Sequence, residues 1–328
     1  MISMSDPRSR NNKRYFRLQF NQTDGLKDWQ VGSVLWQRRP DIPRVPLPNF
    51  PIPLYHETVV ANKSRQSLGS AVRCIYCGAT RFNAHRVELS EEHVISEAFG
   101  AALVLDNASC ESCNRATSGI ESRIVSGMLD PSRKHLDIRG KNPTIRKNRF
   151  KLVTHSAGGE YELLIPSELH PTILFLPLLL PPGKMWRNDH LPFEAVEGYW
   201  AMNVNAHPGT LSKAEFRSFS TPMVDTVTFC QFLAKIAHGF AISKLGETFV
   251  PYHQEFIKRK FAKDETDQGR YHLIGGSILD EEPSSNMHEL ALSSGTIDGV
   301  THYLVRIRLF AKLGAPVYLV LVGQRLFG

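Results

Sequence analysis

Two Cys-x-x-Cys pairs constrain the fold of this chain more than any other feature of its sequence. The first pair is Cys74 and Cys77, the second is Cys110 and Cys113, and 32 residues lie between them. Each such turn presents two sulfur atoms to one ion, and zinc takes four thiolates in a tetrahedron at about 2.3 Å. The spacing therefore predicts a structural zinc ion held by all four cysteines, which fixes both ends of a loop-rich module.

The cysteine count and the length of the apolar runs indicate the compartment. The chain has five cysteines, so they cannot all form disulfides, and in a reducing compartment such pairs favour a metal site. Cys230 lies alone in an apolar segment and is expected in the core. The most apolar stretch, 172–180, is far shorter than the roughly 20 residues that span a bilayer, and the basic N-terminus has no apolar signal segment. We expect a cytoplasmic protein that does not enter a membrane.

Positive charge is concentrated in the half of the chain that holds the paired cysteines. Residues 1–151 contain 24 Lys and Arg against 14 Asp and Glu, while residues 152–328 contain 15 against 18. Residues 133–151 alone contain eight Lys and Arg and one acidic residue. Neutralisation of phosphates by Lys and Arg supplies most non-specific affinity for nucleic acids, so this asymmetry favours a polyanionic partner. For residues 133–151 a solvated loop is an equal alternative.

Composition divides the chain into four consecutive parts. Residues 1–70 are rich in Pro and Arg, and the prolines recur too often for a regular helix or a central strand, so we expect an extended, partly ordered arm. Residues 71–130, called the zinc module below, form a compact unit that ends at Asp130-Pro131. Residues 131–151 make a basic linker, and residues 152–328 a separate α+β domain.

Local patterns in the C-terminal part predict strands, one long helix and a hairpin. Residues 161–165 and 199–204 are expected to be strands, and residues 224–245 show apolar side chains at helical spacing, with Gly246 as a stop. His238 on that helix is expected to be a core or surface residue rather than a ligand. Two β-rich runs, 302–310 and 317–322, surround a Gly-Ala-Pro segment and predict a hairpin.

Chemistry beyond the zinc site is indicated by residues between and after the cysteines. Two acids, Glu91 and Glu92, precede His93 between the two cysteine pairs, and Asn114 directly follows Cys113, the last cysteine of the second pair. The order of these residues resembles the motif of the HNH endonuclease family. That motif reads Cys-x-x-Cys, then an acid followed by His, and then Cys-x-x-Cys-Asn. The resemblance covers residues 71–128, under a fifth of the chain. It implies a treble-clef-like ββα-metal fold for the zinc module, and the whole chain is expected to be α+β.

The ββα order makes expectations for individual elements. The first strand is expected to end near Glu92 and His93, and the helix to begin around Asn114 and run toward Met128. Apolar residues at helical spacing in this segment support a helix, and Gly119 weakens it. The N-terminus of such a helix adds partial positive charge where a phosphate is expected to bind.

Carried over to this chain, the resemblance implies a role for each residue of the motif. Glu92 and Asn114 are implied to ligate a catalytic divalent cation, Mg²⁺ or Mn²⁺, and His93 to activate water as the general base. Asn107 is implied to orient the histidine, although its spacing to Cys110 is shorter than in many members. The chemistry asks for the same residue types, since phosphodiester hydrolysis needs a base for the water and a cation for the charge that develops on the phosphate. Histidine is basic near neutral pH, and oxygen ligands suit Mg²⁺ or Mn²⁺.

Several residues have competing interpretations. Glu91 is the alternative acidic ligand if the motif is shifted by one position, and His85 is more easily explained as a surface loop residue than as a ligand. Six basic residues are candidate nucleic-acid contacts, with a solvated surface as the alternative: Arg81, Arg86, Arg115, Arg123, Arg133 and Lys134.

Two functions of different classes follow from these observations. The first is a metal-dependent HNH endonuclease that hydrolyses phosphodiester bonds, of DNA rather than RNA, with the C-terminal domain available for recognition, a protein partner or self-association. The second is a non-catalytic four-cysteine zinc module that binds nucleic acid or protein. A binding module has no need for the acid-His pair or for the Asn after the last cysteine, so the motif favours the nuclease.

Overall fold

The computed structural model is a mixed α+β structure with many strands and few helices, which agrees with the predicted class. The chain forms two compact units. Unit 1 comprises Met1–Gln37, Arg123–Leu176 and Tyr199–Asp225, and unit 2 comprises Arg38–Ser122, Pro177–Gly198 and Thr226–Gly328. The structure describes residues 2–10, 13–20, 34–38, 57–61, 64–80, 88–100, 102–136, 138, 148–156, 159–186, 196–205, 218–223, 225–259, 273–276 and 281–326. Each unit joins segments that are far apart in sequence, and the division into four consecutive parts stays a prediction about independent folding.

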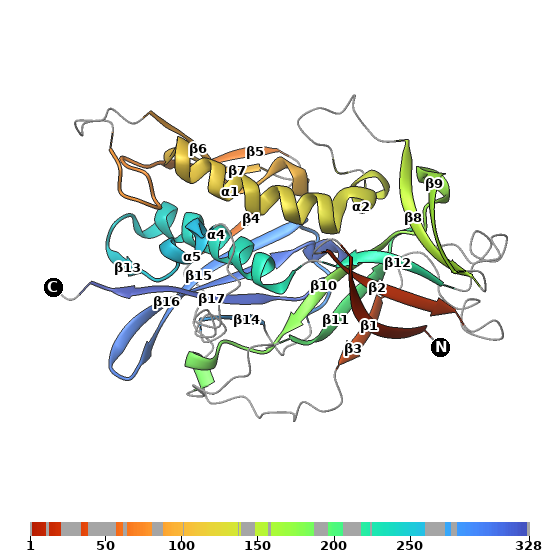
Figure 1. The fold of residues 1–328 in the computed structure, drawn as a ribbon. Helices are drawn as coiled ribbons and strands as arrows, with labels where there is room; N and C mark the ends of the chain where they lie inside the picture. The colour runs from red at the N-terminus through yellow and green to blue at the C-terminus, as the bar shows by residue number, and fades with distance from the viewer. Residues whose placement is uncertain are drawn as a thin grey trace. The chain divides into compact units, whose positions relative to one another are not determined.

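Unit 1 contains an antiparallel five-stranded sheet with the order β1-β2-β12-β8-β9 (Figure 1). Its strands are β1 (Ile2–Arg10), β2 (Lys13–Phe20), β8 (Arg149–Ser156), β9 (Gly159–Pro166) and β12 (Ser218–Met223). The strand predicted at residues 161–165 is confirmed within β9. The N-terminal residues differ from the expected arm, because β2 lies inside the sheet between β1 and β12. The prolines that suggested an arm, residues 40–53, lie outside the described part of the chain.

A three-stranded sheet has the order β10-β11-β3 and contains the most apolar stretch of the sequence. Its strands are β3 (Val34–Arg38), β10 (Ile173–Leu179) and β11 (Val196–Asn203). Every residue of β10 is buried, which explains why this strand is a continuous apolar run rather than an alternating one. The strand predicted at residues 199–204 is confirmed in β11, except that β11 ends at Asn203.

Unit 2 contains a six-stranded sheet with the order β13-β17-β16-β15-β4, in which β14 also pairs with β17. Its strands are β4 (Glu57–Ala61), β13 (Phe249–Pro251), β14 (Ile274–Gly276), β15 (His288–Ile297), β16 (Val300–Leu309) and β17 (Tyr318–Arg325). The predicted C-terminal hairpin is confirmed, since β16 and β17 pair antiparallel. Between them the chain adopts left-handed conformations at Phe310 and Gly314.

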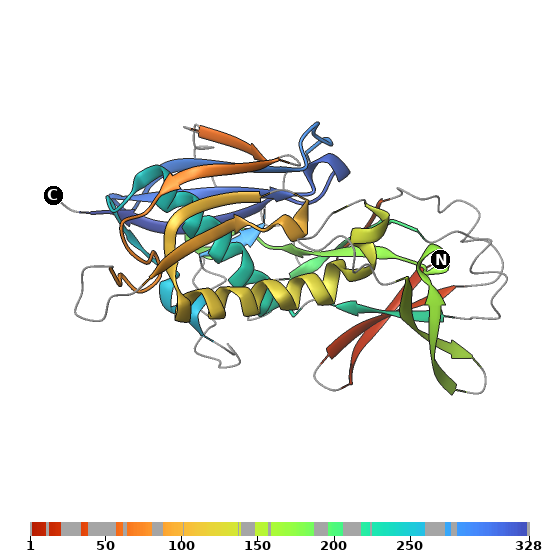
Figure 2. The same ribbon diagram turned by 90° about the horizontal axis from the view of Figure 1, so that it is seen from above.

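Helix α4 (Thr226–Leu245) is the longest helix among the described residues, and it confirms the predicted helix of the C-terminal part. It ends as expected at Gly246, which has φ +60° and donates its backbone N–H to the carbonyl of Ile242 at 2.8 Å. The helix is buried on all sides from Thr228 to Ala241. Its neighbours in unit 2 are β16 and β17 on one side and the small sheet of the zinc module on the other (Figures 1 and 2).

The residues of the zinc module form a small sheet followed by a helix, all but the helix's last two residues in unit 2. The sheet has the order β5-β7-β6, with β5 (Arg65–Ser70) parallel and β6 (Leu89–Ile95) antiparallel to β7 (Ala102–Cys110). Helix α1 (Glu111–Ile124) starts directly after β7. Strand β6 ends at Ile95, two residues past His93, which is near the end that the sequence predicts.

The helix boundaries of the zinc module differ from the prediction. Helix α1 begins three residues before Asn114, because Cys113 lies in its first turn. It continues through a π-helical turn, η2 (Val125–Leu129), into α2 (Asp130–His135). Asp130 and Pro131 therefore begin a helix and do not end the structure, since proline is tolerated in a first helical turn.

The remaining described elements are short. They are η1 (Glu97–Phe99), η3 (Ser167–Leu169), η4 (Gly183–Trp186), α5 (Gln254–Lys258) and η6 (Ala311–Leu313). Across the described residues, the helices are all too short or too polar to cross a membrane.

Candidate metal centre and the residues around it

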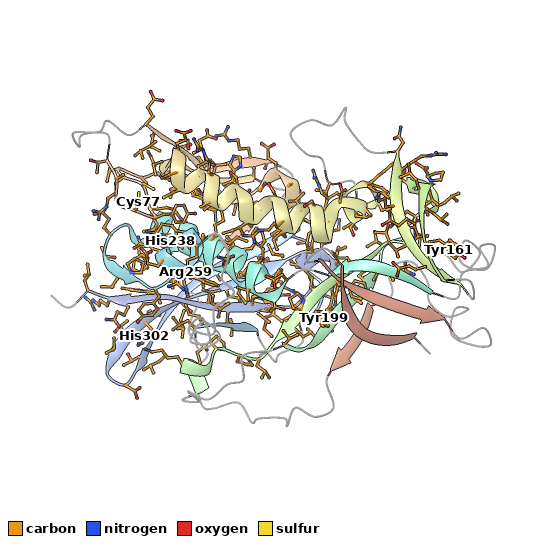
Figure 3. The ribbon with its side chains drawn as sticks, viewed as in Figure 1. Cys77, Tyr161, Tyr199, His238, Arg259 and His302 are labelled. Atoms are coloured by element: carbon orange, nitrogen blue, oxygen red, sulfur yellow. The ribbon has the colours of Figure 1, made fainter. Side chains whose placement is uncertain are left out.

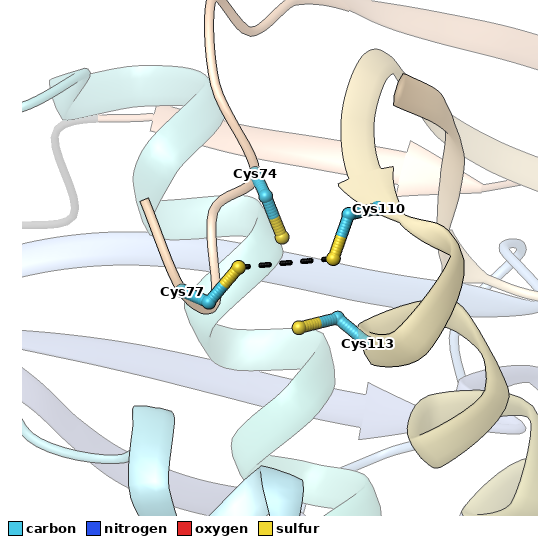
Figure 4. Close-up of side chains that lie close together, drawn as sticks. All are labelled: Cys74, Cys77, Cys110 and Cys113. Atoms are coloured by element: carbon cyan, nitrogen blue, oxygen red, sulfur yellow. Dashed lines mark hydrogen bonds between the residues drawn. The ribbon is translucent and has the colours of Figure 1, made fainter. Parts of the chain in front are cut away.

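The four paired cysteines converge on one point. Their Sγ atoms all lie within 4.8 Å of one another, and the Sγ atoms of Cys77 and Cys110 are 3.7 Å apart (Figure 4). Tetrahedral Zn–S bonds of about 2.3 Å place sulfurs about 3.8 Å apart, which matches this spacing. Cys74, Cys110 and Cys113 are buried, and Cys77 is exposed at the edge. The cluster is therefore compatible with a structural metal ion such as zinc, as predicted.

The first cysteine turn (Cys74–Cys77) is closed by its own backbone. The N–H of Cys74 donates to the carbonyl of Ala79 at 2.8 Å, and the N–H of Gly78 donates to the carbonyl of Cys74 at 2.8 Å. Gly78 has φ +73°, a conformation that glycine adopts without strain. These two hydrogen bonds close the loop from Cys74 to Ala79, and the closed loop holds both sulfur atoms in place.

Hydrogen bonds within the cluster favour a thiolate. The Cys113 thiol, followed by backbone N–H groups that include those of Tyr76 and Cys77, lowers the pKa of Cys74 to about 4 against the effect of burial. The pKa of Cys113 is raised in turn, because its thiol donates to Cys74 and lies next to that negative charge. Metal ions bind the thiolate form, so the first ligand is prepared and an ion displaces the remaining protons.

Helix α4 holds the first cysteine turn from behind. The backbone carbonyl of Ile75 accepts hydrogen bonds from His238 Nε2 and from Gln254 Nε2, both at 2.8 Å. Figure 3 shows His238 on α4 near Cys77. Burial lowers the pKa of His238 to about 4, so the ring is neutral and carries its proton on Nε2. The sequence predicts a core or surface residue rather than a ligand at His238, and the structure shows a core residue. Cys230 is also buried in α4, as expected.

The motif residues of β6 alternate between two faces of the strand. His93 and Glu91 lie on the more exposed face, with side chains 27% and 46% exposed, and His93 Nε2 is 3.9 Å from Glu91 Oε2. Arg65 of β5 pairs with Glu91 at 2.5 Å. Glu92 points to the opposite, buried face, as strand geometry requires of a neighbour in sequence. The acid that shares a face with His93 is therefore Glu91, the alternative considered from the sequence.

Glu92 is engaged by a buried lysine that the sequence did not single out. The Nζ atom of Lys235, on α4, lies 2.9 Å from Glu92 Oε1 and 2.5 Å from Glu121 Oε1, and it also donates to the backbone carbonyl of His93. The Lys235 side chain is 1% exposed. Its pKa is raised, because the two carboxylates outweigh the large opposing effect of burial. The only signal for this residue in the sequence is a lysine within an otherwise apolar helical pattern.

Each asparagine of the motif has a local partner. Asn107 adopts φ +53° at the bulge of β7, a conformation that Asn tolerates, and its Nδ2 donates to Ser70 Oγ at 3.0 Å. Asn114 Nδ2 donates to Ser90 Oγ at 3.0 Å, and Asn114 Oδ1 accepts from Ser118 Oγ at 2.9 Å. These contacts hold α1 against β6 and β7 against β5.

The pair expected to hold a catalytic cation, Glu92 and Asn114, does not fit that role in this arrangement. Glu92 faces the ammonium of Lys235, whereas Asn114 bonds to two serine hydroxyls. Across the ranges that the structure covers, the four cysteines are the one group of three or more His, Cys, Asp or Glu side chains that could hold a metal ion. An ion on Glu92 therefore has no part in the mechanism proposed for this protein.

The candidate nucleic-acid contacts have different surroundings. Arg115 is 76% exposed and pairs with Glu111 one turn before it, and Arg123 is also exposed. Lys134 contacts Ser167 and pairs with Glu168 at 2.9 Å, so its charge is partly neutralised within unit 1. Arg133 is half-buried. The other two candidates, Arg81 and Arg86, lie outside the described residues, and so does His85.

A cavity of about 700 Å³ opens beside the first cysteine turn. It is lined by residues 68–78, Leu105, the C-terminal end of α4, and β13 and α5. His93, Glu92 and Asn114 are not among the residues that line it, so it does not serve the motif predicted from the sequence.

Comparison of this chain with protein-family models, with curated proteins and with solved structures finds no match.

Proposed function

We propose that this protein is a nuclease of the HNH type, which hydrolyses phosphodiester bonds of nucleic acid with His93 as the general base. The order β6, β7, α1 supports this proposal, because an antiparallel strand pair followed by a helix is the order that a ββα module requires. The four-cysteine cluster joins the end of β7 to the first turn of α1, where such a module carries its structural zinc.

The single observation that carries the proposal is the placement of His93. Its imidazole lies on the open face of a strand that the cysteine cluster holds in position, and it is 27% exposed. A general base must reach both water and substrate, which a fully buried histidine such as His238 does not.

The residues on this face suggest how proton transfer proceeds. His93 takes a proton from water through a ring nitrogen, and the hydroxide oxygen forms a bond to phosphorus. The P–O bond to the leaving oxygen breaks, and this oxygen takes a proton from solvent. The Glu91 carboxylate, 3.9 Å from Nε2, stabilises the imidazolium that forms. Arg65, paired with Glu91 at 2.5 Å, fixes the position of that carboxylate beside His93.

The substrate proposed is DNA, with RNA as the alternative, and the exposed Arg115 and Arg123 of α1 are the described candidates for phosphate contacts. Phosphate contacts of this kind position a backbone without reading its sequence. The divalent cation of the reaction, Mg²⁺ or Mn²⁺, stays part of the proposal as what the family resemblance implies. Of the two acids, Glu91 lies on the same face as His93, where Arg65 already pairs with it.

The test is a cleavage assay on supercoiled, linear, single-stranded and branched DNA and on RNA, with Mg²⁺ or Mn²⁺. We expect His93→Gln to lower the cleavage rate by at least about 100-fold, because a general base typically contributes that much or more. Zinc content and melting temperature should not change, since Gln retains a hydrogen-bonding side chain of similar size. Glu162→Ala, an exposed position on β9, is the control for purification and should cleave like the wild type.

Equal cleavage by the wild type and His93→Gln would contradict the assignment of the base. Absence of cleavage on every substrate, with binding of nucleic acid retained by both forms, would favour the second function, a non-catalytic zinc module. One observation favours that alternative: Glu92, the acid of the motif, is neutralised by Lys235 instead of facing the open side of β6.

A further inference from the structure

The four cysteines of the cluster differ in their access to solvent. Cys77 is exposed, whereas Cys74, Cys110 and Cys113 are buried, with at most 5% of their surface exposed. Cys77 also lines the cavity of about 700 Å³ beside the first cysteine turn, and neither Cys110 nor Cys113 is among the described residues that line it. Cys77 is therefore the cysteine of the cluster that a small molecule from solution reaches most readily.

A buried sulfur lies directly beside the exposed one. The Sγ atoms of Cys77 and Cys110 are 3.7 Å apart (Figure 4). The sulfurs of a disulfide are about 2.05 Å apart, so these two sulfurs need to approach by roughly 1.7 Å to form a bond. A metal ion keeps its cysteine ligands as thiolates, which is the form that reacts with oxidants. The cluster thus combines an accessible nucleophile with a second sulfur within its reach.

The other two sulfurs form a separate pair. The Cys113 thiol hydrogen-bonds to Cys74, and both residues are buried. Susceptibility of cysteine to oxidation follows its exposure, so this pair is shielded from an oxidant that reaches Cys77. The arrangement therefore favours one disulfide over the others that four cysteines allow.

We propose that Cys77 is a modification site for hydrogen peroxide, and that its oxidation leads to a Cys77–Cys110 disulfide. This disulfide takes the place of the metal ion as the link between the first cysteine turn and the end of β7. The inference rests on the cluster holding zinc, and it does not rest on the proposed nuclease function.

The chemistry takes place in two steps. The Cys77 thiolate attacks one oxygen of the peroxide, so that an S–O bond forms, the O–O bond breaks and hydroxide leaves. The Cys110 thiolate then attacks the sulfur of this sulfenic acid, so that the S–S bond forms, the S–O bond breaks and a second hydroxide leaves. The two thiolates together lose two electrons, and the peroxide gains them. Cys74 and Cys113 remain as ligands, and we expect the site to lose its metal ion.

The test is exposure of the zinc-loaded full chain to hydrogen peroxide after removal of all reductant. We expect loss of about two thiols and release of about one zinc ion per chain, followed by the colour of a zinc chelator. Mass spectrometry of peptides prepared without reduction should show Cys77 joined to Cys110, with Cys74 and Cys113 free to react with iodoacetamide. A dithiol and added zinc should restore the starting protein.

Two matched variants separate the exposed ligand from a buried one. Histidine also ligates zinc in structural sites, so Cys77→His and Cys113→His can each keep a four-ligand centre. Cys77→His lacks the reactive sulfur, and we expect it to release zinc at least about 10-fold more slowly than the wild type. Cys113→His keeps both reacting sulfurs and should release zinc at nearly the wild-type rate. Cys230→Ala should behave like the wild type, because Cys230 is outside the cluster.

A further readout is the stability of the oxidised protein. A disulfide constrains the unfolded chain, so the oxidised protein should melt above the reduced, zinc-free protein. The proposal is overturned if the first disulfide joins another pair, if zinc stays bound after the thiols are lost, or if Cys77→His releases zinc as fast as the wild type. A melting temperature no higher than that of the reduced, zinc-free protein would contradict the link between the turn and β7. Should either histidine variant fail to bind zinc, the disulfide mapped in the wild type still decides.

Discussion

At the scale of single residues, each cysteine of the cluster contributes one bond to the expected metal. Cys113 is buried in the first turn of α1, and a hydroxyl is a poor ligand for the site that four thiolates form. We expect Cys113→Ser to lower the zinc content from about one ion per chain to well below one, and to lower the melting temperature, because metal binding stabilises the folded module. Zinc is measured by atomic spectroscopy after dialysis.

Cys230→Ala is the matched control for this experiment. Cys230 is buried in α4 and is not part of the cluster, so its replacement should leave the zinc content unchanged. Full zinc retention in Cys113→Ser would show that the four sulfurs do not share an ion.

The protonation of His288 makes stability depend on pH. Its Nε2 donates to the carbonyl of Phe99 at 2.7 Å, and its Nδ1 accepts the N–H of Phe310 at 3.1 Å. Burial lowers the pKa of this histidine to about 4, from an ordinary value near 6.5. Protonation of Nδ1 would place a second N–H group against the backbone N–H of Phe310, so the native ring stays neutral. Because the unfolded chain binds the proton first, this contribution to stability is complete above pH 6.5 and is lost as the pH falls from 6.5 to 4.

We expect the wild type to lose about 2 kcal/mol of unfolding free energy between pH 7 and pH 5 through His288 alone. His288→Gln removes the titrating group, so its stability, although lower at pH 7, should fall less over the same range. Urea unfolding at both pH values measures the difference. An equal fall in the two proteins would mean that His288 is protonated in the native state.

The sequence could predict some of these residues but not others. The cysteine cluster follows from spacing alone, because a Cys-x-x-Cys turn is a local structure. The pairing of Glu92 with Lys235 does not follow from spacing, because the two residues are far apart in sequence. Lys235 lies 142 residues after His93, the neighbour of Glu92, whose carbonyl it also contacts. That Glu92 and His93 face opposite sides is a consequence of strand geometry, whereas the family resemblance implies a common site for the two side chains.

At the scale of elements, the contact between α4 and β6 depends on a glycine. A Cβ atom at Gly239 meets Cγ2 of buried Val94 at 2.9 Å, closer than a carbon contact allows. Gly239→Ala is therefore expected to destabilise the protein by about 1–3 kcal/mol, despite the better helix propensity of alanine. The measurement is the unfolding free energy at equilibrium in urea.

Gly119 on α1 provides the matched control for this glycine. A Cβ atom there meets nothing within 4 Å. Gly119→Ala should accordingly stabilise the protein by about 0.5–1 kcal/mol. If both substitutions change the unfolding free energy in the same direction, the close approach of α4 to β6 does not determine which side chain position 239 accepts.

Elements with strong local patterns could be predicted, and their boundaries were less certain. The apolar spacing and terminal glycine predicted α4, and alternating β-rich runs predicted β16 and β17. Helix α1 begins three residues before the predicted start, because Cys113, which the Cys-x-x-Cys pattern assigns to a turn, lies within the helix. Pro131 predicts the end of the zinc module, but it lies in the first turn of α2. Proline is compatible with a first helical turn as well as with the end of a helix.

At the scale of the whole molecule, the zinc module shares its unit with the C-terminal residues. Lys235, His238 and Gln254 all contact the residues of the module. We expect an isolated fragment of residues 64–136 to bind zinc but to unfold without a sharp thermal transition, because the buried face of its sheet loses α4. Circular dichroism during heating, with zinc present, measures this. A cooperative transition like that of the full chain would show that the module folds independently.

Sheet composition at this scale could not be predicted from local patterns. Strand β2 pairs with β12, and β4 pairs with β15, although each pair is separated by about two hundred residues of sequence. The patterns of single strands do not specify their partners, and register over such distances depends on the complete core. The general α+β class could be predicted, whereas the discontinuous units could not.

The position of Lys235 in the chain has a consequence for synthesis on the ribosome. Glu121 is translated 114 residues before its lysine partner, and Glu92 earlier still. At about 5–20 residues per second, the nascent chain carries these acids without their counter-ion for roughly 6–23 seconds. All four cysteines have already been made by then, so an ion can close their cluster while the acids still face water. The cysteine cluster can therefore take up a metal ion before α4 covers the sheet of the zinc module.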